Sequence, residues 1–95
     1  MTRIEIIFSQ ALEEDIFVAF KKIPEAQFFT LIPGIKGKGY STPKMGDSVW
    51  PEFNELMIIY CPSESGTGQI KDALARVQKK YPTEGLAYFM TENVV

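Results

Sequence analysis

The sequence predicts one α+β domain in which four strands and two helices follow one another in the order β-α-β-β-α-β. Three observations lead to this fold class. Four segments have the two-residue periodicity, or the β-branched and aromatic composition, of strands. Two other segments repeat apolar residues at helical spacing, and prolines close most of these segments. The chain has 95 residues, too few for a second independent core, so residues 1–95 are predicted to form a single domain.

The first strand and the first helix are the best-defined pair. Residues 3–8 form the strand, with Ile4, Ile6 and Phe8 on one face. Ser9 can cap the helix that follows, and Pro24 ends it. The apolar positions of this helix are Leu12, Ile16, Ala19, Phe20 and Ile23. Glu13, Glu14 and Asp15 are interpreted as charges at its N-terminus rather than as an acid/base pair.

The second and third strands flank a long loop. The second is predicted over residues 27–32, from Gln27 to Ile32, and ends at Pro33-Gly34. The third is predicted over residues 53–61, where a continuous apolar run from Leu56 to Cys61 precedes Pro62. Because this run does not alternate with polar residues, we expect the third strand to be buried on both faces.

The second helix and the fourth strand complete the pattern. Ser65 or Thr67 can cap the helix, and Pro82 closes it. Its apolar positions are Ile70, Ala73, Leu74, Val77 and Tyr81. The fourth strand is predicted over residues 86–90, Leu-Ala-Tyr-Phe-Met.

This order of elements predicts a ferredoxin-like sandwich: a four-stranded antiparallel sheet with both helices on one face. Two right-handed β-α-β units place their helices on the same side. The other face would then expose the apolar third strand, and exposed apolar faces are rare on soluble monomers. We therefore expect a homo-oligomer that buries this face. The alternative is that alternate residues of this strand meet the rim of the sheet or the long loop.

The loop between the second and third strands carries the candidate site. Residues 33–52 hold four of the seven glycines and lack periodicity. In Gly34-Ile35-Lys36-Gly37-Lys38-Gly39, glycines allow backbone N–H groups to face an anion and lysines add positive charge. The alternative is a mobile arm whose glycines serve flexibility, since the strand-to-helix context of a phosphate-binding fingerprint is absent.

The rest of the loop is interpreted as a surface for a partner protein. Tyr40, Ser41 and Thr42 place hydroxyl groups at the predicted tip, where a partner or a modifying enzyme can reach them. Lys44 adds a positive charge to the same segment. Trp50 is expected to pack on a neighbouring subunit or on its own chain.

Composition argues against several function classes. The chain has no histidine and one cysteine, so a zinc or copper site is not expected. Cys61 has no histidine to activate it, so we expect an inert core thiol and no catalytic residues. A net charge of −2 and a pI near 5.1 argue against nucleic-acid binding. No apolar run approaches the roughly 20 residues of a membrane span, so we expect a cytoplasmic protein without membrane insertion.

Taken together, the chain resembles the PII and PII-like signalling proteins over almost its whole length. The resemblance is carried by the order of elements and by three segments: Arg3-Ile4-Glu5-Ile6-Ile7, Gly34-Ile35-Lys36-Gly37-Lys38-Gly39 and Thr83-Glu84-Gly85-Leu86. The second resembles the entry to the family's T-loop and the third the end of its B-loop. Leu86 stands where the family's phosphate-binding lysine is expected, so the chain is a divergent member by this comparison.

The resemblance implies a regulator and not an enzyme. PII-like proteins are trimers that bind effector nucleotides in clefts between subunits and dock their T-loop on a transporter or an enzyme. Carried over by position, the T-loop base contains Gly37, Lys38 and Gly39, and the facing B-loop contains Thr83, Glu84 and Gly85. An adenine nucleotide is the effector that this resemblance implies.

Two other interpretations of the fold remain open. One is a metal-binding trimer similar to the divalent-cation tolerance proteins, with carboxylates and Cys61 as ligands. The other is a small ferredoxin-like enzyme such as a monooxygenase or an acylphosphatase. For the latter, Ser9-Gln10-Ala11 lacks the arginine of an acylphosphatase phosphate cradle.

Overall fold

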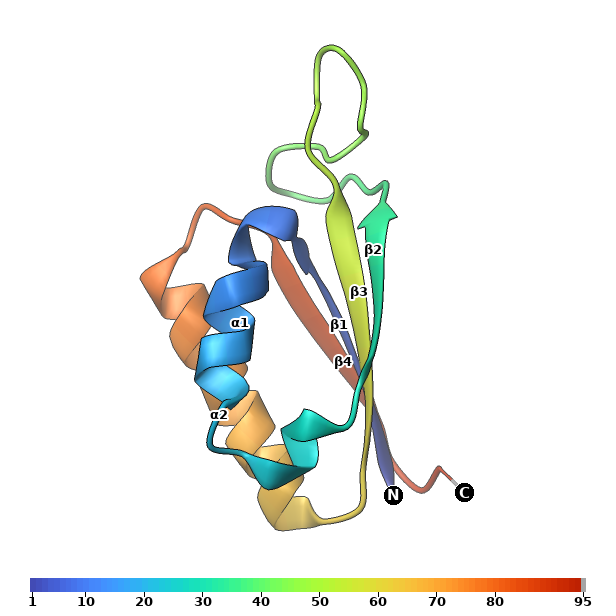
Figure 1. Cartoon of the computed structure of the whole chain (residues 1–95), viewed down its shortest axis with the longest axis vertical. Coiled ribbons are helices and arrows are strands. Elements are labelled where there is room, and N and C mark those ends of the chain that lie inside the picture. Colours follow the sequence, from blue (N-terminus) through green and yellow to red (C-terminus); the bar gives the residue numbers. More distant parts are fainter. Residues whose placement is uncertain (95) are drawn as a thin grey trace.

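The computed structural model describes residues 1–94 and has a two-layer architecture. Strands β1 (Thr2–Ser9), β2 (Thr30–Ile35), β3 (Asn54–Cys61) and β4 (Leu86–Thr91) form one sheet. Helices α1 (Glu13–Phe20) and α2 (Glu64–Lys80) cover one of its faces, as Figure 1 shows, with 3-10 turns η1 (Gln10–Leu12) and η2 (Pro24–Gln27) beside α1. The predicted α+β ferredoxin-like fold is confirmed.

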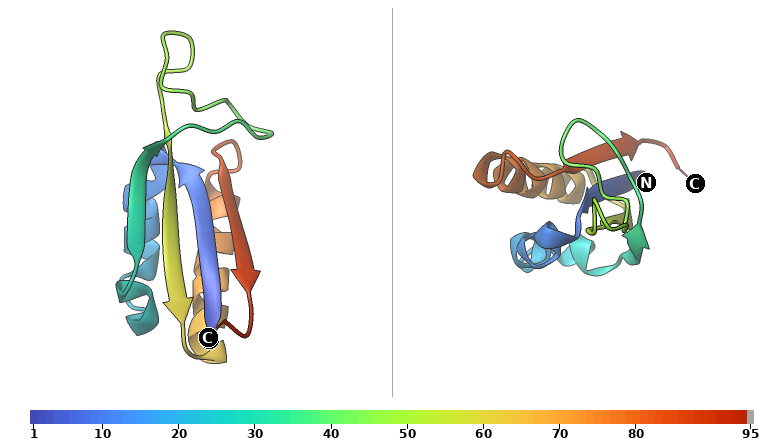
Figure 2. Two further views of the ribbon diagram at one scale, coloured as in Figure 1. Left: turned by 90° about the vertical axis from the view of Figure 1, so that its right-hand side faces the viewer. Right: turned by 90° about the horizontal axis from the view of Figure 1, so that it is seen from above.

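The strands lie in the order β2-β3-β1-β4, and every neighbouring pair is antiparallel. Figure 2 shows this order face-on, with the helices behind the sheet. The two chain-order neighbours β1 and β2 are not paired, because β3 lies between them. The long loop leaves the end of the sheet where β2 stops and β3 begins.

The core lies between the sheet and the helices. Alternate residues of β1 and β3 point inward and are fully buried, including Ile4, Ile6 and Phe8 from β1 and Met57 and Ile59 from β3. The helices contribute Ile16, Phe20, Ile70, Ala73, Leu74 and Val77. Cys61 also belongs to this core, so the predicted buried thiol is confirmed.

The opposite side of the sheet has no covering layer in the single chain, and we call it the open face. Its residues follow from the strand register: Arg3, Glu5, Ile7, Thr30, Ile32, Leu56, Ile58, Tyr60, Ala87, Phe89 and Thr91. Ile58 and Leu56 are half-buried, while Phe89 is 57% exposed. The prediction that β3 is buried on both faces is therefore wrong for the isolated chain, in which only the inward face of this strand is buried.

Several element boundaries differ from the prediction. The first helix was expected between Ser9 and Pro24, but α1 ends at Phe20, Ser9 caps η1, and Pro24 begins η2. The second strand was expected over residues 27–32, but β2 runs from Thr30 to Ile35. A strand can contain Pro33 and Gly34 here for two reasons. β2 lies at the edge of the sheet, and its register with β3 shifts between Ile32 and Ile35. Gln27 instead donates from its side-chain amide to the carbonyl oxygens of Phe20 (2.7 Å) and Ile23 (3.1 Å), which holds η2 against the end of α1.

The start of α2 also differs. Ser63 is the cap, and its hydroxyl oxygen accepts from the backbone N–H of Gly66 at 3.0 Å. The expected caps, Ser65 and Thr67, lie inside the helix, and Thr67 donates back to the Ser63 carbonyl at 3.0 Å. The Ser63 hydroxyl donates in turn to Glu25, and the Cys61 thiol lies 3.3 Å from the same carboxylate, so η2 is joined to the start of α2.

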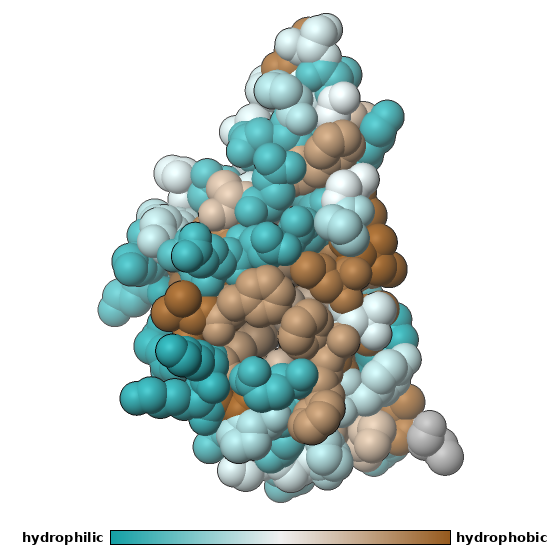
Figure 3. All heavy atoms as spheres, viewed as in Figure 1, coloured by the Kyte–Doolittle hydropathy of each residue, from teal (hydrophilic) through white to brown (hydrophobic). Residues whose placement is uncertain are grey.

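An apolar patch lies on the outer surface between the helical layer and β2. The rings of Phe17, in α1, and Phe29, just before β2, lie 5.4 Å apart in a tilted arrangement. Apolar atoms are gathered over this region in the space-filling view (Figure 3). Phe28 and Val18 are also exposed, at 77% and 67%. Within residues 1–94, no helix is both long and apolar enough to cross a bilayer.

Candidate functional site: a pocket beneath the loop

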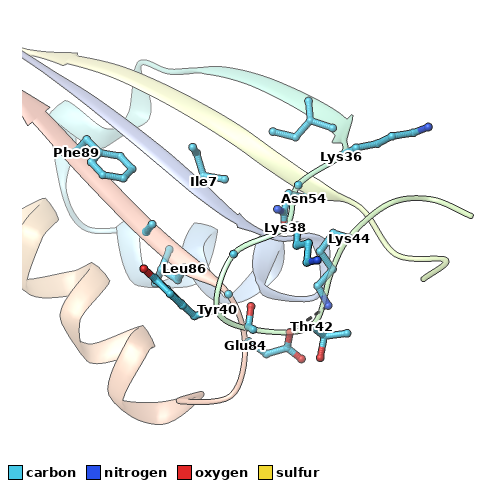
Figure 4. A pocket seen from close by; sticks show the side chains of 16 residues that line it. Ile7, Lys36, Lys38, Tyr40, Thr42, Lys44, Asn54, Glu84, Leu86 and Phe89 are labelled. Atoms are coloured by element: carbon cyan, nitrogen blue, oxygen red, sulfur yellow. Dashed lines mark ion pairs between the residues drawn. The ribbon is translucent and has the colours of Figure 1, made fainter. Parts of the chain in front are cut away.

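A pocket of about 620 Å³ lies between the loop, the end of the open face and the turn that precedes β4. Figure 4 shows it from close by, with side chains from these three segments turned around one space. Its lining residues are Ile7, Ile35, Lys36, Gly37, Lys38, Gly39, Tyr40, Ser41, Thr42, Lys44, Asn54, Glu84, Gly85, Leu86, Ala87 and Phe89. Segments separated by more than forty residues in the sequence therefore meet here.

The floor of the pocket is apolar. Ile7 lies opposite Ala87 in the register of β1 and β4, and Phe89 is the next open-face residue along β4. Strand alternation places these three side chains on the same face of the sheet. The floor is suited to a flat apolar group such as an aromatic ring, because it offers surface for contact and few hydrogen-bonding groups.

The loop is not a structureless arm but contains two smaller units. Residues 37–44, which we call the inner arm, are closed by two backbone hydrogen bonds between Gly37 and Lys44, each 2.7 Å long. A β-carbon on Gly37 would lie 2.5 Å from the side-chain nitrogen of Asn54, so a larger residue here would displace the Asn54 side chain. The inner arm passes across the ends of β1 and β4, as the left panel of Figure 2 shows.

Residues 45–53, which we call the outer lobe, extend beyond the inner arm. The Asp47 carboxylate accepts from the backbone N–H groups of Val49 (3.0 Å) and Trp50 (2.6 Å), and this turn shapes the lobe. Gly46 has a positive φ of 64° and packs against the Phe53 ring, so a side chain at position 46 is strained and has no room. None of the residues that line the pocket comes from this lobe.

The three lysines near the inner arm have different environments. Lys36 and Lys38 are exposed and form no ion pair within residues 1–94. In Figure 4 the Lys36 side chain extends away from the pocket, while the Lys38 side chain lies on the inner side of the arm beside Lys44, whose ammonium group points toward Glu84. Lys38 is therefore the better placed of the two free cations for a ligand in the pocket.

Lys44 is buried, with only 4% of its surface exposed. Its ammonium nitrogen lies 3.2 Å from Oε1 of Glu52, to which it donates a hydrogen bond, and 3.8 Å from Oε1 of Glu84. We expected Lys44 to face a partner protein, and its position in the single chain argues against this role. Burial between two carboxylates makes it an internal link of the loop, a role that spacing in the sequence does not reveal.

The turn before β4 closes the other side of the pocket. The Gly85 carbonyl accepts from the backbone N–H of Ser9 at 2.9 Å, which fixes the turn to the end of β1. A β-carbon on Gly85 would lie 2.9 Å from the hydroxyl of Ser41, so the inner arm and the turn are in close contact. Glu84 contributes the one carboxylate among the lining residues.

The structure brings together most of the residues that the sequence assigned to a ligand site. Lys36, Gly37, Lys38 and Gly39 line the same pocket as Glu84 and Gly85. Gly34 and Thr83 do not line it: Gly34 lies in β2 with a φ of 67°, and Thr83 is exposed at the start of the turn.

The predicted partner-facing residues are divided by the structure. Tyr40, Ser41 and Thr42 line the pocket on the inner arm, although Tyr40 is also fully exposed. Trp50 belongs to the outer lobe and is 40% exposed, so it is neither fully packed on its own chain nor free.

One buried carboxyl near this end of the sheet was missed by sequence reasoning. Glu55 points inward from β3, is 7% exposed, and its Oε1 has no hydrogen-bond partner among the described residues. Burial raises the pKa of its carboxyl, and the charge of Glu13 and a hydrogen bond with Glu13 raise that pKa further. The available signal was a charged residue at an inward position of an otherwise apolar strand.

No group of three or more histidine, cysteine, aspartate or glutamate side chains in the described part of the chain is arranged to hold a metal ion.

The described residues form a ferredoxin-like domain with a long loop between its second and third strands. No protein-family profile matches the sequence, and no curated protein sequence matches it either. Solved structures do match. They include CPII from Thiomonas intermedia K12 bound to ADP and bicarbonate, with a TM-score of 0.72 and 17% identity over 95% of this chain and 82% of that chain.

Two further structures give the same result. The apo form of CPII has a TM-score of 0.63 and 13% identity over 95% of this chain and 87% of that one. A PII-like signalling protein from Thermus thermophilus has a TM-score of 0.57 and 16% identity over 95% and 83% of the two chains. The chain has the PII-like fold, and its sequence has diverged far from those of these structures.

Proposed function

We propose that this protein is a PII-like regulator that binds a small anionic effector, an adenine nucleotide, in the pocket beneath the inner arm. One observation carries the proposal: a glycine- and lysine-containing arm and an apolar floor enclose the same space. Lys38 and the backbone N–H groups of the flanking glycines suit a phosphate group, and the floor formed by Ile7, Ala87 and Phe89 suits the base. CPII, which has the same fold, has been solved with ADP, AMP and bicarbonate.

The proposal includes a homotrimer. The pocket opens at the end of the open face, and two of its floor residues, Ile7 and Phe89, belong to that face. A second subunit packed on the open face would provide a further wall of the pocket, so that the effector lies between subunits. The loop then presents Tyr40 and the outer lobe with Trp50 to a target protein. In this role the protein is a sensor and adaptor and not an enzyme.

Isothermal titration of the purified protein with ADP, AMP, ATP and bicarbonate tests the effector site. We expect an adenine nucleotide to bind, and we expect Lys38→Ala to weaken its affinity by about tenfold, the loss of one charge-assisted contact, equivalent to about 1.4 kcal/mol. Lys36→Ala should have a smaller effect, because that side chain extends away from the pocket.

Lys21→Ala is the matched control, because Lys21 is an exposed lysine at the end of α1, on the helical layer. It removes the same charge and should leave binding unchanged. If no adenine nucleotide binds, or if Lys38→Ala binds as tightly as the unsubstituted protein, the proposed site is wrong. A thermal-shift assay gives an independent readout, since ligand at 100 times its Kd stabilises a protein by about 2.7 kcal/mol.

A further inference from the structure

We propose that Glu84 acts as an internal competitor for the anion site, and that an effector must displace its carboxylate from Lys44 in order to bind tightly. The inference rests on the proposed function, because it concerns how the same pocket takes its ligand. Its consequence is that binding of a phosphate group and release of the inner arm are coupled.

The contacts of Lys44 support this role for Glu84. Lys44 is one of the pocket-lining residues, and its ammonium group is already neutralised by two carboxylates, so this group of three residues has a net charge of −1. The two carboxylates are not equivalent. Glu52 accepts a hydrogen bond at 3.2 Å, whereas Glu84 is 3.8 Å away and accepts none. The contact with Glu84 is therefore the weaker one and the easier to replace.

The positions of the two carboxylates also support Glu84 as the competitor. Glu84 is itself a pocket-lining residue, while Glu52 is not. A phosphate group that enters the pocket approaches Lys44 from the side of Glu84 and competes with it for the same cation. A phosphate carries more charge than a carboxylate, and burial strengthens its attraction to Lys44. The same phosphate repels the Glu84 carboxylate.

Displacement of Glu84 affects the inner arm directly. The Lys44–Glu84 pair and the contact between Ser41 and Gly85 join the inner arm to the turn before β4. Lys44 also closes the arm through its backbone hydrogen bonds to Gly37. When the ammonium group turns from Glu84 to the ligand, the arm loses its charged link to the turn. The conformation of the arm thus depends on whether an anion occupies the pocket.

The test compares the unsubstituted protein with Glu84→Gln and Glu52→Gln, each of which removes one carboxylate from Lys44. The probes are pyrophosphate, ADP and adenosine, measured by isothermal titration. We expect Glu84→Gln to bind pyrophosphate and ADP about tenfold more tightly, because a competing anion is gone. Adenosine has no phosphate, so its affinity should not change. Glu52→Gln leaves Glu84 as the sole carboxylate on Lys44, so anion affinity should stay the same or fall.

Hydrogen exchange without any ligand provides the second readout. In Glu84→Gln we expect the amides of Gly37 and Lys44 to exchange about tenfold faster than in Glu52→Gln, since the charged link from the arm to the turn is lost. Equal exchange of these amides in all three proteins would overturn the inference.

The binding data separate the two proposals. If ADP binds the unsubstituted protein and Glu84→Gln equally well, the competition by Glu84 is disproved while the effector site stands. If neither pyrophosphate nor any adenine nucleotide binds the unsubstituted protein or Glu84→Gln, both proposals fail. If Glu84→Gln binds pyrophosphate tightly and the unsubstituted protein does not, the competition by Glu84 is supported.

Discussion

At the scale of single residues, the charged groups that matter most are the buried ones. Lys44 and Glu55 are both more than nine-tenths buried, and they lie at the same end of β3 for different reasons. Lys44 is compensated by two carboxylates, whereas Glu55 has Glu13, another acid, beside it. Burial of a charge is unfavourable unless a partner of opposite sign compensates it. We therefore expect Glu55 to reduce the stability of the fold when it is ionised.

Replacement of Glu55 by glutamine should raise the free energy of unfolding at neutral pH. Because the folded-state pKa of Glu55 is raised, its destabilising effect is absent below the unfolded pKa, grows as the pH rises from the unfolded pKa to the folded pKa, and is constant above it. Each unit of raised pKa corresponds to about 1.4 kcal/mol at neutral pH. Urea unfolding of both proteins between about pH 7 and pH 4 should show a difference that shrinks as the pH falls.

The control for this prediction is Glu92→Gln, which neutralises an exposed carboxyl near the end of the chain. It should change the unfolding free energy little at any pH in this range. A Glu55→Gln variant that is less stable than the unsubstituted protein at neutral pH would contradict the prediction and would mean that the carboxylate is favourably solvated or paired.

At the scale of elements, the start of α2 is held by packing as well as by its cap. Gly66, in the first turn, lies where a β-carbon would collide with the Glu25 carboxylate and come within 2.9 Å of the Cys61 sulfur. Glu25 cannot move away without losing its hydrogen bonds to Ser63 and Cys61. Gly68, two residues later, has open space around it. The same helix thus contains one glycine that packing requires and one that it does not.

The variants Gly66→Ala and Gly68→Ala should therefore have opposite effects on stability. We expect Gly66→Ala to lower the unfolding free energy by about 1 to 3 kcal/mol, because it displaces Glu25 from its hydrogen bonds. Gly68→Ala should raise it by about 0.5 to 1 kcal/mol, because alanine is the better helix former at an unobstructed position. Urea unfolding measures both, and each variant is the control for the other. Equal effects of the two substitutions would contradict this description of the helix start.

Much of the element pattern could be predicted from the sequence, and the exceptions have physical causes. The cores of β1, α1, β3, α2 and β4 follow from periodicity, because local pattern and burial agree there. The limits of β2 do not, because Pro33 and Gly34 are turn residues in most settings and are tolerated here by an edge strand with a shifted register. The cap of α2 was misplaced because Ser63, Ser65 and Thr67 offer similar hydroxyl groups, and contact with Glu25 favours Ser63.

The candidate site was predictable in part. Its glycines and free lysines were identified because their composition is unusual for a loop. The role of Lys44 was not, because it depends on the pairing of Gly37 with Lys44 and on the approach of Glu84 from a segment forty residues away. The buried carboxyl of Glu55 was also missed, since its environment is created by Glu13 from another element.

At the scale of the whole molecule, the open face is the feature that the single chain leaves unexplained. It carries apolar side chains from all four strands: Ile7, Ile32, Leu56, Ile58, Ala87 and Phe89. Polar groups interrupt this face: Glu5 lies opposite Ile58 and Phe89 in the register and pairs with Arg3 at 3.0 Å, and Arg3 lies near the Tyr60 ring. A sheet face with apolar side chains from every strand is typical of a surface that another subunit covers. We therefore expect subunits to assemble through this face.

The substitution Ile58→Asp should dissociate the assembly and leave the subunit folded. Ile58 is half-buried at the centre of the open face, so a carboxylate there remains hydrated in a monomer but becomes an unpaired buried charge in an interface. Sedimentation equilibrium should show a trimer for the unsubstituted protein and a monomer for the variant, with circular dichroism confirming the fold.

The control is Ala75→Asp, which adds the same charge to an exposed position of α2 and should leave the trimer intact. A monomeric unsubstituted protein, or an Ile58→Asp variant that still assembles, would show that the open face is not the subunit interface.

The division of the loop into an inner arm and an outer lobe separates two kinds of evolutionary constraint. The inner arm lies over the pocket and is joined to the turn before β4, so changes there alter the ligand site. The outer lobe is shaped by its own Asp47 turn and contributes no side chain to the pocket. Glu52 is the exception, because it pairs with Lys44. Mutations in residues 47–51 can therefore accumulate without altering what the pocket recognises. Under the proposed function, a lineage with this loop can acquire a new target while it keeps its old signal.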